Sequence, residues 1–268
     1  EAAAPSFAEV LAVYLKPRVL IVMFLGFSAG LPLALSGSTL QVWSTESGLD
    51  LRTIGLFTLV GTPYTIKFLW APLVDGLDVP LLSGLLGRRR GWLVFSQLLL
   101  MAAIVFLAFC DPAAAPWLVA FGALLVATAS ATQDIVIDAF RVESLDESEQ
   151  AAGMASYVAA YRIGMLVSTA GALYFVTGFE WSGLAKQAAW TAAFIAMAGL
   201  VLIGVATTIA ATEPQASADA AQAGPGSLKR VADAATGAFG DFLMRDMAVA
   251  VLVFVVLYKL CDAFAGAM

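Results

Sequence analysis

Long apolar runs are the feature that most limits what this chain can fold into. A helix needs about 20 mostly apolar residues to cross the core of a membrane. Seven runs of roughly that length occur here, at residues 19–42, 54–74, 92–109, 117–139, 153–177, 188–211 and 247–268. Only 13% of the 268 residues are charged, against about 25% in a typical soluble domain. The sequence therefore predicts an all-α membrane protein.

The composition excludes several kinds of site. The chain has no histidine, and its two cysteines, Cys110 and Cys261, are too few for a cysteine-rich metal site. The 14 basic and 20 acidic residues give a net charge of −6, whereas nucleic-acid-binding proteins carry a basic excess. No nucleophile–base pair or phosphate-binding loop is recognisable. We therefore expect no enzyme activity, no metal, no cofactor and no nucleic-acid partner.

Lysines and arginines between the runs predict the orientation, because cytoplasmic loops carry an excess of them. If the N-terminal segment 1–18 is cytoplasmic, the basic residues on that side are Lys16, Arg18, Arg88, Arg89, Arg90, Arg141, Lys229, Arg230 and Arg245. Only Arg52 and Lys186 fall on the opposite side. The sequence therefore predicts a cytoplasmic N-terminus in a multi-pass protein of the lipid bilayer.

The order of the runs indicates a particular fold. Six runs fill residues 19–211, a long segment covers 212–246, and the seventh run covers 247–268. The long segment begins like a flexible linker, and residues 227–243 fit either an amphipathic helix on the membrane surface or a loosely ordered linker. This layout matches the first half of a major facilitator transporter, in which each six-helix bundle is a three-plus-three inverted repeat. We expect the N-terminal bundle, a cytoplasmic linker and the start of the C-terminal bundle, a fragment that would not transport without its missing C-terminal bundle.

Glycine and proline interrupt the first two runs. Gly26 and Gly30 form a G-x-x-x-G pair, which is typical of close helix packing, although a flexible cavity-lining helix would also use them. Gly61 and Pro63 in the second run fit close packing or a broken helix that lines a cavity.

Charged residues within the runs mark a cavity. The third and sixth runs contain none, and we expect them to face lipid. Four of the other runs hold Lys67, Asp134, Asp138, Arg162, Lys259 and Asp262. Ionisable groups inside a bilayer are costly and face a protein interior or a water-filled cavity. These side chains are therefore the first candidates for a functional site.

Asp134 and Asp138 are four residues apart and share one face of a helix. Arg141 can neutralise Asp138, and we expect this pair to act in gating at the cytoplasmic mouth. Asp134 lies about 9 Å from the end of its run at about 1.5 Å per residue. Because the chain has no histidine, a carboxylate is the natural proton carrier of a proton-coupled transporter. Asp134 is the first candidate and Asp262 the second, although paired carboxylates can also be structural.

Lys67 and Arg162 lie in the second and fifth runs, which are equivalent members of the two repeats. Two cations that face one cavity would bind the anionic groups of a substrate, and the forked guanidinium of arginine suits a carboxylate or a phosphate. The alternative is that each cation is simply paired with Asp134 or Asp262.

A further charge cluster follows the second run. Asp75 closes that run, and Arg88, Arg89 and Arg90 precede the third, as in the signature loop of major facilitator transporters, although the loop here is longer. None of them is placed to stabilise the dipole of its own helix. We therefore expect charge pairing across the cytoplasmic face that holds one conformation. Anchoring by the positive-inside rule explains the arginines but not Asp75.

Six stretches resemble the AmpG family of muropeptide permeases. They are residues 26–33 (GFSAGLPL), 67–75 (KFLWAPLVD), 87–92 (GRRRGW), 133–141 (QDIVIDAFR), 161–165 (YRIGM) and 259–266 (KLCDAFAG). The resemblance implies an importer of anhydro-muropeptides across the bacterial inner membrane by proton symport. Such an importer feeds peptidoglycan recycling and, in bacteria that have the system, β-lactamase induction and so β-lactam resistance.

The resemblance also implies roles for single residues. An anhydro-muropeptide joins a disaccharide to a peptide that bears several carboxylates. The side chains that suit the carboxylates are Lys67, Arg162 and Lys259, and those that suit the sugar by hydrogen bonding and stacking are Gln41, Trp43, Gln133 and Tyr161. Trp43 and Tyr161 fit equally well as interface or packing aromatics.

Two other functions stay open at this point. One is an importer of another bulky anion such as acetyl-CoA, because acetyl-CoA transporters resemble the same family. A phosphate-rich substrate would require more clustered arginine than is present. The other is a membrane receptor or assembly subunit that does not transport, against which the buried charges argue.

Overall fold

The computed structural model describes residues 7–214 and a few positions beyond them: 236–237, 240, 244, 247–251, 253–254 and 257. Lys259, Cys261 and Asp262 lie outside the described residues, as do most of the predicted amphipathic segment 227–243 and most of the seventh run. Within residues 7–214 the chain is helical, and none of these residues forms a strand.

Helical rods account for residues 17–210, after the short helix α1 (Phe7–Tyr14). Two rods contain a π-helical segment. One consists of α2 (Pro17–Ala34), the π segment η1 (Leu35–Thr39) and α3 (Leu40–Glu46). The other consists of the 3-10 turn η4 (Glu147–Glu149), α10 (Gln150–Leu166), the π segment η5 (Val167–Gly171) and α11 (Ala172–Trp181). Three rods are single helices: α8 (Arg88–Ala108), α9 (Pro116–Ser144) and α12 (Lys186–Ala210).

The rod built from the second run is broken into short pieces. They are α4 (Leu51–Leu56), η2 (Phe57–Gly61), α5 (Thr62–Ile66), η3 (Lys67–Leu69) and α6 (Ala71–Gly76). Pro63 and Pro72 stand in the first turns of α5 and α6, where a missing N–H is tolerated but the preceding helix cannot continue unbroken. The structure thus confirms a broken helix at Gly61–Pro63.

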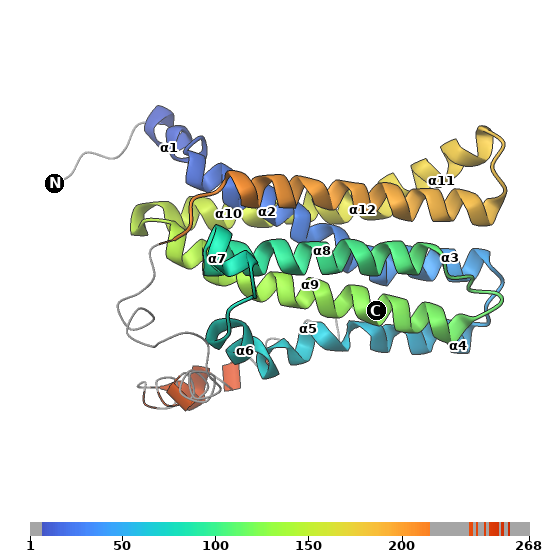
Figure 1. Cartoon of the computed structure of the whole chain (residues 1–268), viewed down its shortest axis with the longest axis horizontal. Helices are drawn as coiled ribbons and strands as arrows, with labels where there is room; N and C mark the ends of the chain where they lie inside the picture. Colours follow the sequence, from blue (N-terminus) through green and yellow to red (C-terminus); the bar gives the residue numbers. More distant parts are fainter. Residues whose placement is uncertain are drawn as a thin grey trace.

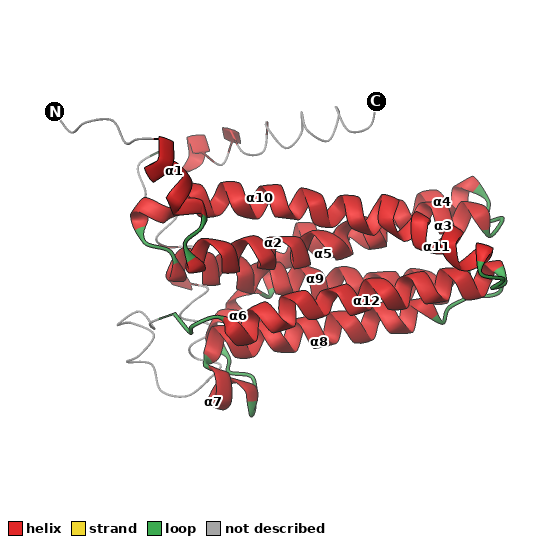
Figure 2. Cartoon of the chain, turned by 90° about the horizontal axis from the view of Figure 1, so that it is seen from above, coloured by secondary structure: helices red, strands yellow, loops and turns green. Residues whose placement is uncertain are grey.

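The rods lie side by side with their long axes roughly parallel (Figure 1). α2 packs on α10, and α8 packs on both α9 and α12. The loops gather at two ends (Figure 2). We call the end that holds α1, the short helix α7 (Leu82–Leu86) and the start of α8 the Arg89 end. The end that holds α3, α4 and the start of α12 is the Trp43 end.

Five of the rods are long and apolar enough to cross a membrane. They correspond to the first and third to sixth predicted runs, extended by a few residues at most ends. The second run is not among them, and its rod consists of five short helical pieces. Within the described residues, five predicted runs thus coincide with membrane-length helices, and the second coincides with the broken rod.

Backbone contact between α2 and α10 explains two of the glycines. A Cβ atom at Gly26 would lie 2.6 Å from the carbonyl oxygen of Tyr157, and one at Gly30 would overlap the carbonyl oxygen of Tyr161. On the facing helix, a Cβ atom at Gly164 would overlap the carbonyl oxygen of Phe27. Small residues allow this close approach where helices cross in a membrane. The close-packing interpretation of Gly26 and Gly30 therefore holds.

An aromatic cluster joins α3 to α12 at the Trp43 end. The Trp43 side chain is fully buried, with its ring centroid 5.9 Å from that of Trp190 and 4.9 Å from that of Phe194. The indole N–H of Trp190 donates to Glu46 at 3.1 Å, and Lys186 pairs with Glu46 at 3.2 Å. Trp43 is thus placed as a packing aromatic and not as the sugar-stacking surface that was one of its two predicted roles.

The glycine contact yields a prediction about stability. Gly30→Ala should lower the free energy of unfolding by about 1–3 kcal/mol, because an added methyl group must push the two backbones apart. Thermal unfolding of the purified protein in detergent, followed by size-exclusion chromatography, measures the effect. The matched control is Gly199→Ala on α12, where no atom lies within 4 Å of the added carbon. Equal melting temperatures for the two variants would contradict the packing argument.

Candidate functional site

A cavity of about 380 Å³ lies between four rods, and we call it the central cavity. Its charged and tyrosine side chains are Lys67, Asp134, Asp138, Tyr157, Tyr161 and Arg162, and Leu33, Val158 and Met165 complete the lining. They come from η3, α9, α10 and α2. The structure thus brings together five of the residues that the sequence singled out from separate runs.

Helical spacing places these side chains. Asp134 and Asp138 stand one turn apart on α9, and Tyr157 and Tyr161 stand one turn apart on α10. The two tyrosine rings lie 5.9 Å apart. Because the backbone of α10 presses on Gly26 and Gly30 at these two tyrosines, their side chains are held beside α9. Tyr157 was not predicted, although its spacing from Tyr161 is a usable signal.

Asp138 is shared between two cations. Its carboxylate oxygens lie 3.8 Å from the Nζ of Lys67 and 3.8 Å from an Nη of Arg141. The suggested pairing of Lys67 with Asp134 is therefore wrong in this structure, because Lys67 meets the carboxylate one turn further along α9. The side chain of Arg162 is exposed and forms no ion pair with any described residue.

Asp134 has a different environment. It is 7% exposed, and its Oδ1 atom is buried without a hydrogen-bond partner among the described residues. Because α9 runs on to Ser144, Asp134 lies about 15 Å from the end of its helix at about 1.5 Å per residue, deeper than the sequence suggested. Burying an ionised carboxylate without a partner costs several kcal/mol. We therefore expect this oxygen atom to bind a proton, a water molecule or a ligand.

Further unpartnered polar atoms lie close to Asp134. Both amide atoms of Gln133, the Oγ of Ser130 and the hydroxyl of Tyr64 are buried without hydrogen bonds in the described part of the chain. Tyr64 belongs to α5, and its hydroxyl lies near Ser130 on α9 and within the field of Asp134. Natural proteins leave few such atoms unpaired, which makes this group a candidate functional feature beside the central cavity.

Three predicted substrate-binding residues do not line the central cavity. Gln133 is fully buried behind the cavity wall, Gln41 is exposed on α3 and Trp43 lies in the aromatic cluster. Lys259 and Asp262 fall outside the described residues. Tyr161 does line the cavity, which fits its predicted contact role better than an interface role.

The predicted charge cluster lies at the Arg89 end. Arg89 is 6% exposed and pairs with Asp75 at 2.6 Å and with Glu143 at 2.5 Å. Arg88 donates to the backbone carbonyl of Asp75. Asp75 lies in α6, the last piece of the broken rod, and Glu143 lies in the last turn of α9, so Arg89 joins three rods through one guanidinium. Glu143 was missed because only the packing of α8 beside α9 brings it near Arg89.

A second pair of contacts ties the start of α8 to the end of α12. The carboxylate of Glu213 accepts from the backbone amides of Arg89 at 2.8 Å and Arg90 at 3.0 Å. Arg90 donates to the carbonyls of Thr208 at 2.9 Å and Ile209 at 2.7 Å. Each side chain thus caps the end of the other helix with the charge that its dipole favours. Arg90 is therefore not placed to stabilise the dipole of its own helix, as expected, but it stabilises that of the neighbouring helix α12.

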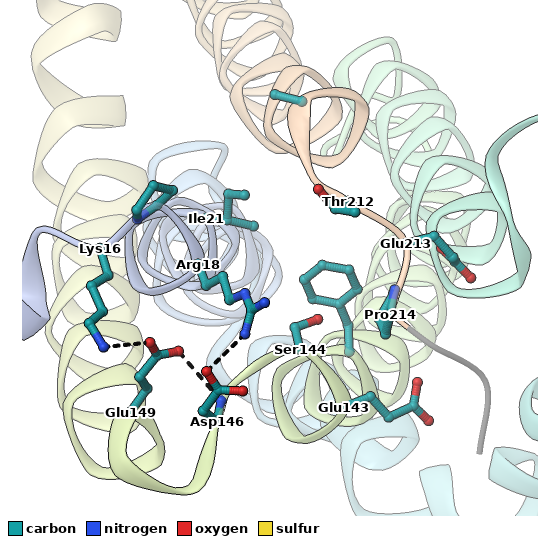
Figure 3. A pocket seen from close by; sticks show the side chains of 13 residues that line it. Lys16, Arg18, Ile21, Glu143, Ser144, Asp146, Glu149, Thr212, Glu213 and Pro214 are labelled. Carbon is teal, nitrogen blue, oxygen red and sulfur yellow. Dashed lines mark hydrogen bonds and ion pairs between the residues drawn. The ribbon is translucent and has the colours of Figure 1, made fainter. Parts of the chain in front are cut away.

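A larger pocket of about 670 Å³ opens at the same end (Figure 3). Its carboxylates already have partners. Lys16 pairs with Glu149 at 2.8 Å and Arg18 with Asp146 at 3.0 Å, while Glu143 and Glu213 make the contacts described above. This pocket therefore has few charges to offer a ligand, whereas Arg162 and Asp134 in the central cavity form no ion pair within the described part of the chain.

Membrane-length helices around a charged cavity define an all-α membrane protein with several spans. The sequence profile of the Major Facilitator Superfamily matches residues 10–266, and the chain belongs to that superfamily. Within it, the chain is 40% identical over 259 residues to the anhydromuropeptide permease of Escherichia coli K12, which covers 96% of this chain and 49% of that protein.

Other relatives agree with this placement. A putative transporter AmpG 4 of Rickettsia felis is 32% identical over 94% of this chain and 58% of its own length. An uncharacterized protein of Haemophilus influenzae is 36% identical over 92% of this chain and 55% of its own length. The chain spans about half the length of these curated relatives. The relatives with a named function are named as a permease and a putative transporter, so the chain is a homologue of membrane transporters.

The reciprocal caps yield a second prediction. Glu213→Ala should destabilise the purified protein by about 0.5–2 kcal/mol, the usual effect of losing a side-chain cap at a helix N-terminus. Melting in detergent measures the loss. Glu180→Ala, at an exposed glutamate on α11 with no ion pair among the described residues, is the control and should leave the melting temperature unchanged. If both variants melt with the wild type, the carboxylate of Glu213 does not stabilise α8.

Proposed function

We propose that this chain forms the substrate-binding half of a secondary transporter that imports anhydro-muropeptides across the bacterial inner membrane by proton symport. The central cavity carries the proposal, because it places the cations Lys67 and Arg162 beside the buried carboxylate of Asp134, whose Oδ1 has no hydrogen-bond partner among the described residues. The 40% identity to a permease named for anhydromuropeptides supports the choice of substrate.

We also propose the arrangement in the membrane. Residues 1–18 are a cytoplasmic N-terminus, 19–211 the N-terminal bundle, 212–246 a cytoplasmic linker and 247–268 the first helix of a second bundle. The excess of Lys and Arg at the Arg89 end supports this orientation, and it makes the Trp43 end periplasmic.

The exposed side chain of Arg162 supports the existence of a second bundle. A guanidinium at this depth has to be covered by protein or water, because facing lipid would cost several kcal/mol. We propose that the second bundle covers the central cavity and encloses the substrate between the two halves. Lys259 and Asp262 would then belong to the helix that begins the second half.

The parts of the substrate would divide among the cavity residues. The peptide carboxylates meet Arg162, whose fork can bind them bidentately, and Lys67, which is held only loosely by Asp138 at 3.8 Å. Tyr161 offers its ring and hydroxyl to the sugar. Gln133 would reach the sugar only after a movement of the cavity wall, because it is fully buried here.

Asp134 is the proposed proton carrier. When a substrate carboxylate occupies Lys67 and Arg162, their positive charge no longer stabilises an ionised Asp134. Asp134 then takes up a proton, so that substrate binding and proton binding are coupled. Asp138, held by Lys67 and Arg141, belongs to the gate together with the Asp75–Arg89–Glu143 network, which closes the cytoplasmic side in one conformation.

Arg162 provides the first test of substrate binding. Arg162→Ala should lower uptake of labelled anhydro-muropeptide by roughly tenfold to hundredfold, as expected for the loss of hydrogen bonds to a charged group. Arg162→Lys should also be impaired because a point charge lacks the fork. Uptake is measured in proteoliposomes that carry the full-length protein. Arg52→Ala, at an exposed arginine outside the cavity, is the control. Wild-type uptake by both Arg162 variants would contradict the role of Arg162.

Asp134→Asn tests the coupling. The amide mimics a protonated carboxylate, so the variant should still exchange labelled for unlabelled substrate but should no longer concentrate it when a pH gradient is applied. Asp138→Asn should reduce exchange and accumulation together, because it disturbs the gate. If Asp134→Asn still concentrates substrate against a gradient, the proton is carried elsewhere, with Asp262 as the next candidate.

A further inference from the structure

Two π-helical segments lie side by side in the bundle. η1 interrupts the first rod between α2 and α3, and η5 interrupts the fifth rod between α10 and α11. π segments are rare and lie frequently at functional sites. Here they occupy the same level of two neighbouring rods, beside the central cavity: Leu33 of the cavity wall stands two residues before η1, and Met165 two residues before η5.

One hydrogen bond joins the two segments. The hydroxyl of Thr39 in η1 donates to the backbone carbonyl of Ser168 in η5 at 2.6 Å, and both residues are almost fully buried. In a regular α-helix the amide of Ala172 would donate to this carbonyl, four residues earlier. Here that amide donates to the carbonyls of Val167 and Thr169. The π geometry of η5 thus leaves the Ser168 carbonyl available to Thr39.

The rods are held differently on the two sides of this bond. Toward the Arg89 end, α2 and α10 are locked together at Gly26, Gly30 and Gly164. Toward the Trp43 end, α3 is bonded to α12 through Glu46, and α11 also packs on α12. No atom lies within 4 Å of a Cβ placed at Gly37 in η1, whereas Leu35, Ser36 and Thr39 of the same segment are buried. The two π segments are thus the irregular turns that lie between the two sets of contacts.

We infer that Thr39 is a positioning residue for transport, whose bond to the Ser168 carbonyl transmits occupancy of the central cavity to α3 and α11 at the Trp43 end. The inference rests on the proposed transport function. A ligand that binds Arg162 exerts a force on α10 at a position about one turn N-terminal to η5. If η5 then rewinds to an α-helix, the Ala172 amide recaptures the Ser168 carbonyl and Thr39 is released. Bond kept and bond released are two discrete states, as a switching element requires.

Three threonine variants separate this role from simple packing. Thr39→Val keeps the shape of the side chain but removes the hydroxyl, and Thr39→Ser restores the hydroxyl. Thr177→Val is the matched control, because the Thr177 hydroxyl bonds only within its own helix, to the Leu173 carbonyl at 3.0 Å. Each is made in the full-length protein and measured for anhydro-muropeptide affinity and for maximal uptake in proteoliposomes.

We expect Thr39→Val to keep the affinity for anhydro-muropeptide and to lower the maximal rate about threefold to tenfold, the effect of one lost hydrogen bond. Thr39→Ser and Thr177→Val should match the wild type. Spin labels at Thr45→Cys on α3 and Tyr174→Cys on α11, with Cys110 and Cys261 replaced by serine, report the distance between the two helices. Anhydro-muropeptide should shift this distance in the wild type but not in Thr39→Val.

Two outcomes would overturn the inference. One is that Thr39→Val and Thr177→Val show the same maximal uptake rate and the same substrate-induced change in the distance between the spin labels. The other is loss of affinity, rate and thermal stability together, which indicates a structural role only. The distance distribution without substrate separates this failure from a failure of the proposed function. It should broaden in Thr39→Val relative to Thr39→Ser even if the wild type takes up no anhydro-muropeptide.

Discussion

The backbones of α2 and α10 touch at Gly26, Gly30 and Gly164, and this contact fixes the geometry of the central cavity. Any side chain at those positions would separate the helices and carry Tyr157, Tyr161 and their neighbour Arg162 away from α9. Because lipid offers no hydrophobic driving force between helices, such close packing is a main source of helix association in a membrane. The charged groups of the cavity therefore face one another only because two helices meet without side chains between them.

Two clusters of charge on this scaffold have opposite character. At the Arg89 end, Arg89 is matched by Asp75 and Glu143, and Glu213 and Arg90 cap each other's helices. In the central cavity, Arg162 has no ion pair among the described residues and Asp134 Oδ1 has no hydrogen bond there. Satisfied charges stabilise one arrangement of the helices, whereas unsatisfied ones await a ligand or a proton. This difference separates the proposed gate from the proposed transport site.

Much of this could be predicted from the sequence, because hydrophobic length and helical spacing are local properties. They predicted seven runs, five of which are membrane-length helices among the described residues, and the shared face of Asp134 and Asp138. The equivalence of the two repeats predicted that Lys67 and Arg162 face one cavity. Contacts between distant segments could not be predicted in this way. Glu143 and Glu213 reach Arg89 only through the packing of α9 and α12 on α8, and Trp43 is buried by Trp190 and Phe194. The π segments leave no signal in apolar periodicity, so the Thr39–Ser168 bond emerges only from the structure.

The central claim is that a substrate anion and a proton are bound in the same cavity. Calorimetric titration of anhydro-muropeptide into the full-length protein, in two buffers with different enthalpies of ionisation, measures it most directly. If substrate carboxylates neutralise Lys67 and Arg162, these cations no longer stabilise the ionised form of Asp134. Substrate binding near neutral pH then takes up protons from the buffer. Asp134→Asn abolishes this proton uptake, while the substrate still binds. Binding heats that are identical in both buffers for the wild type, at every pH between 5 and 8, would contradict the account.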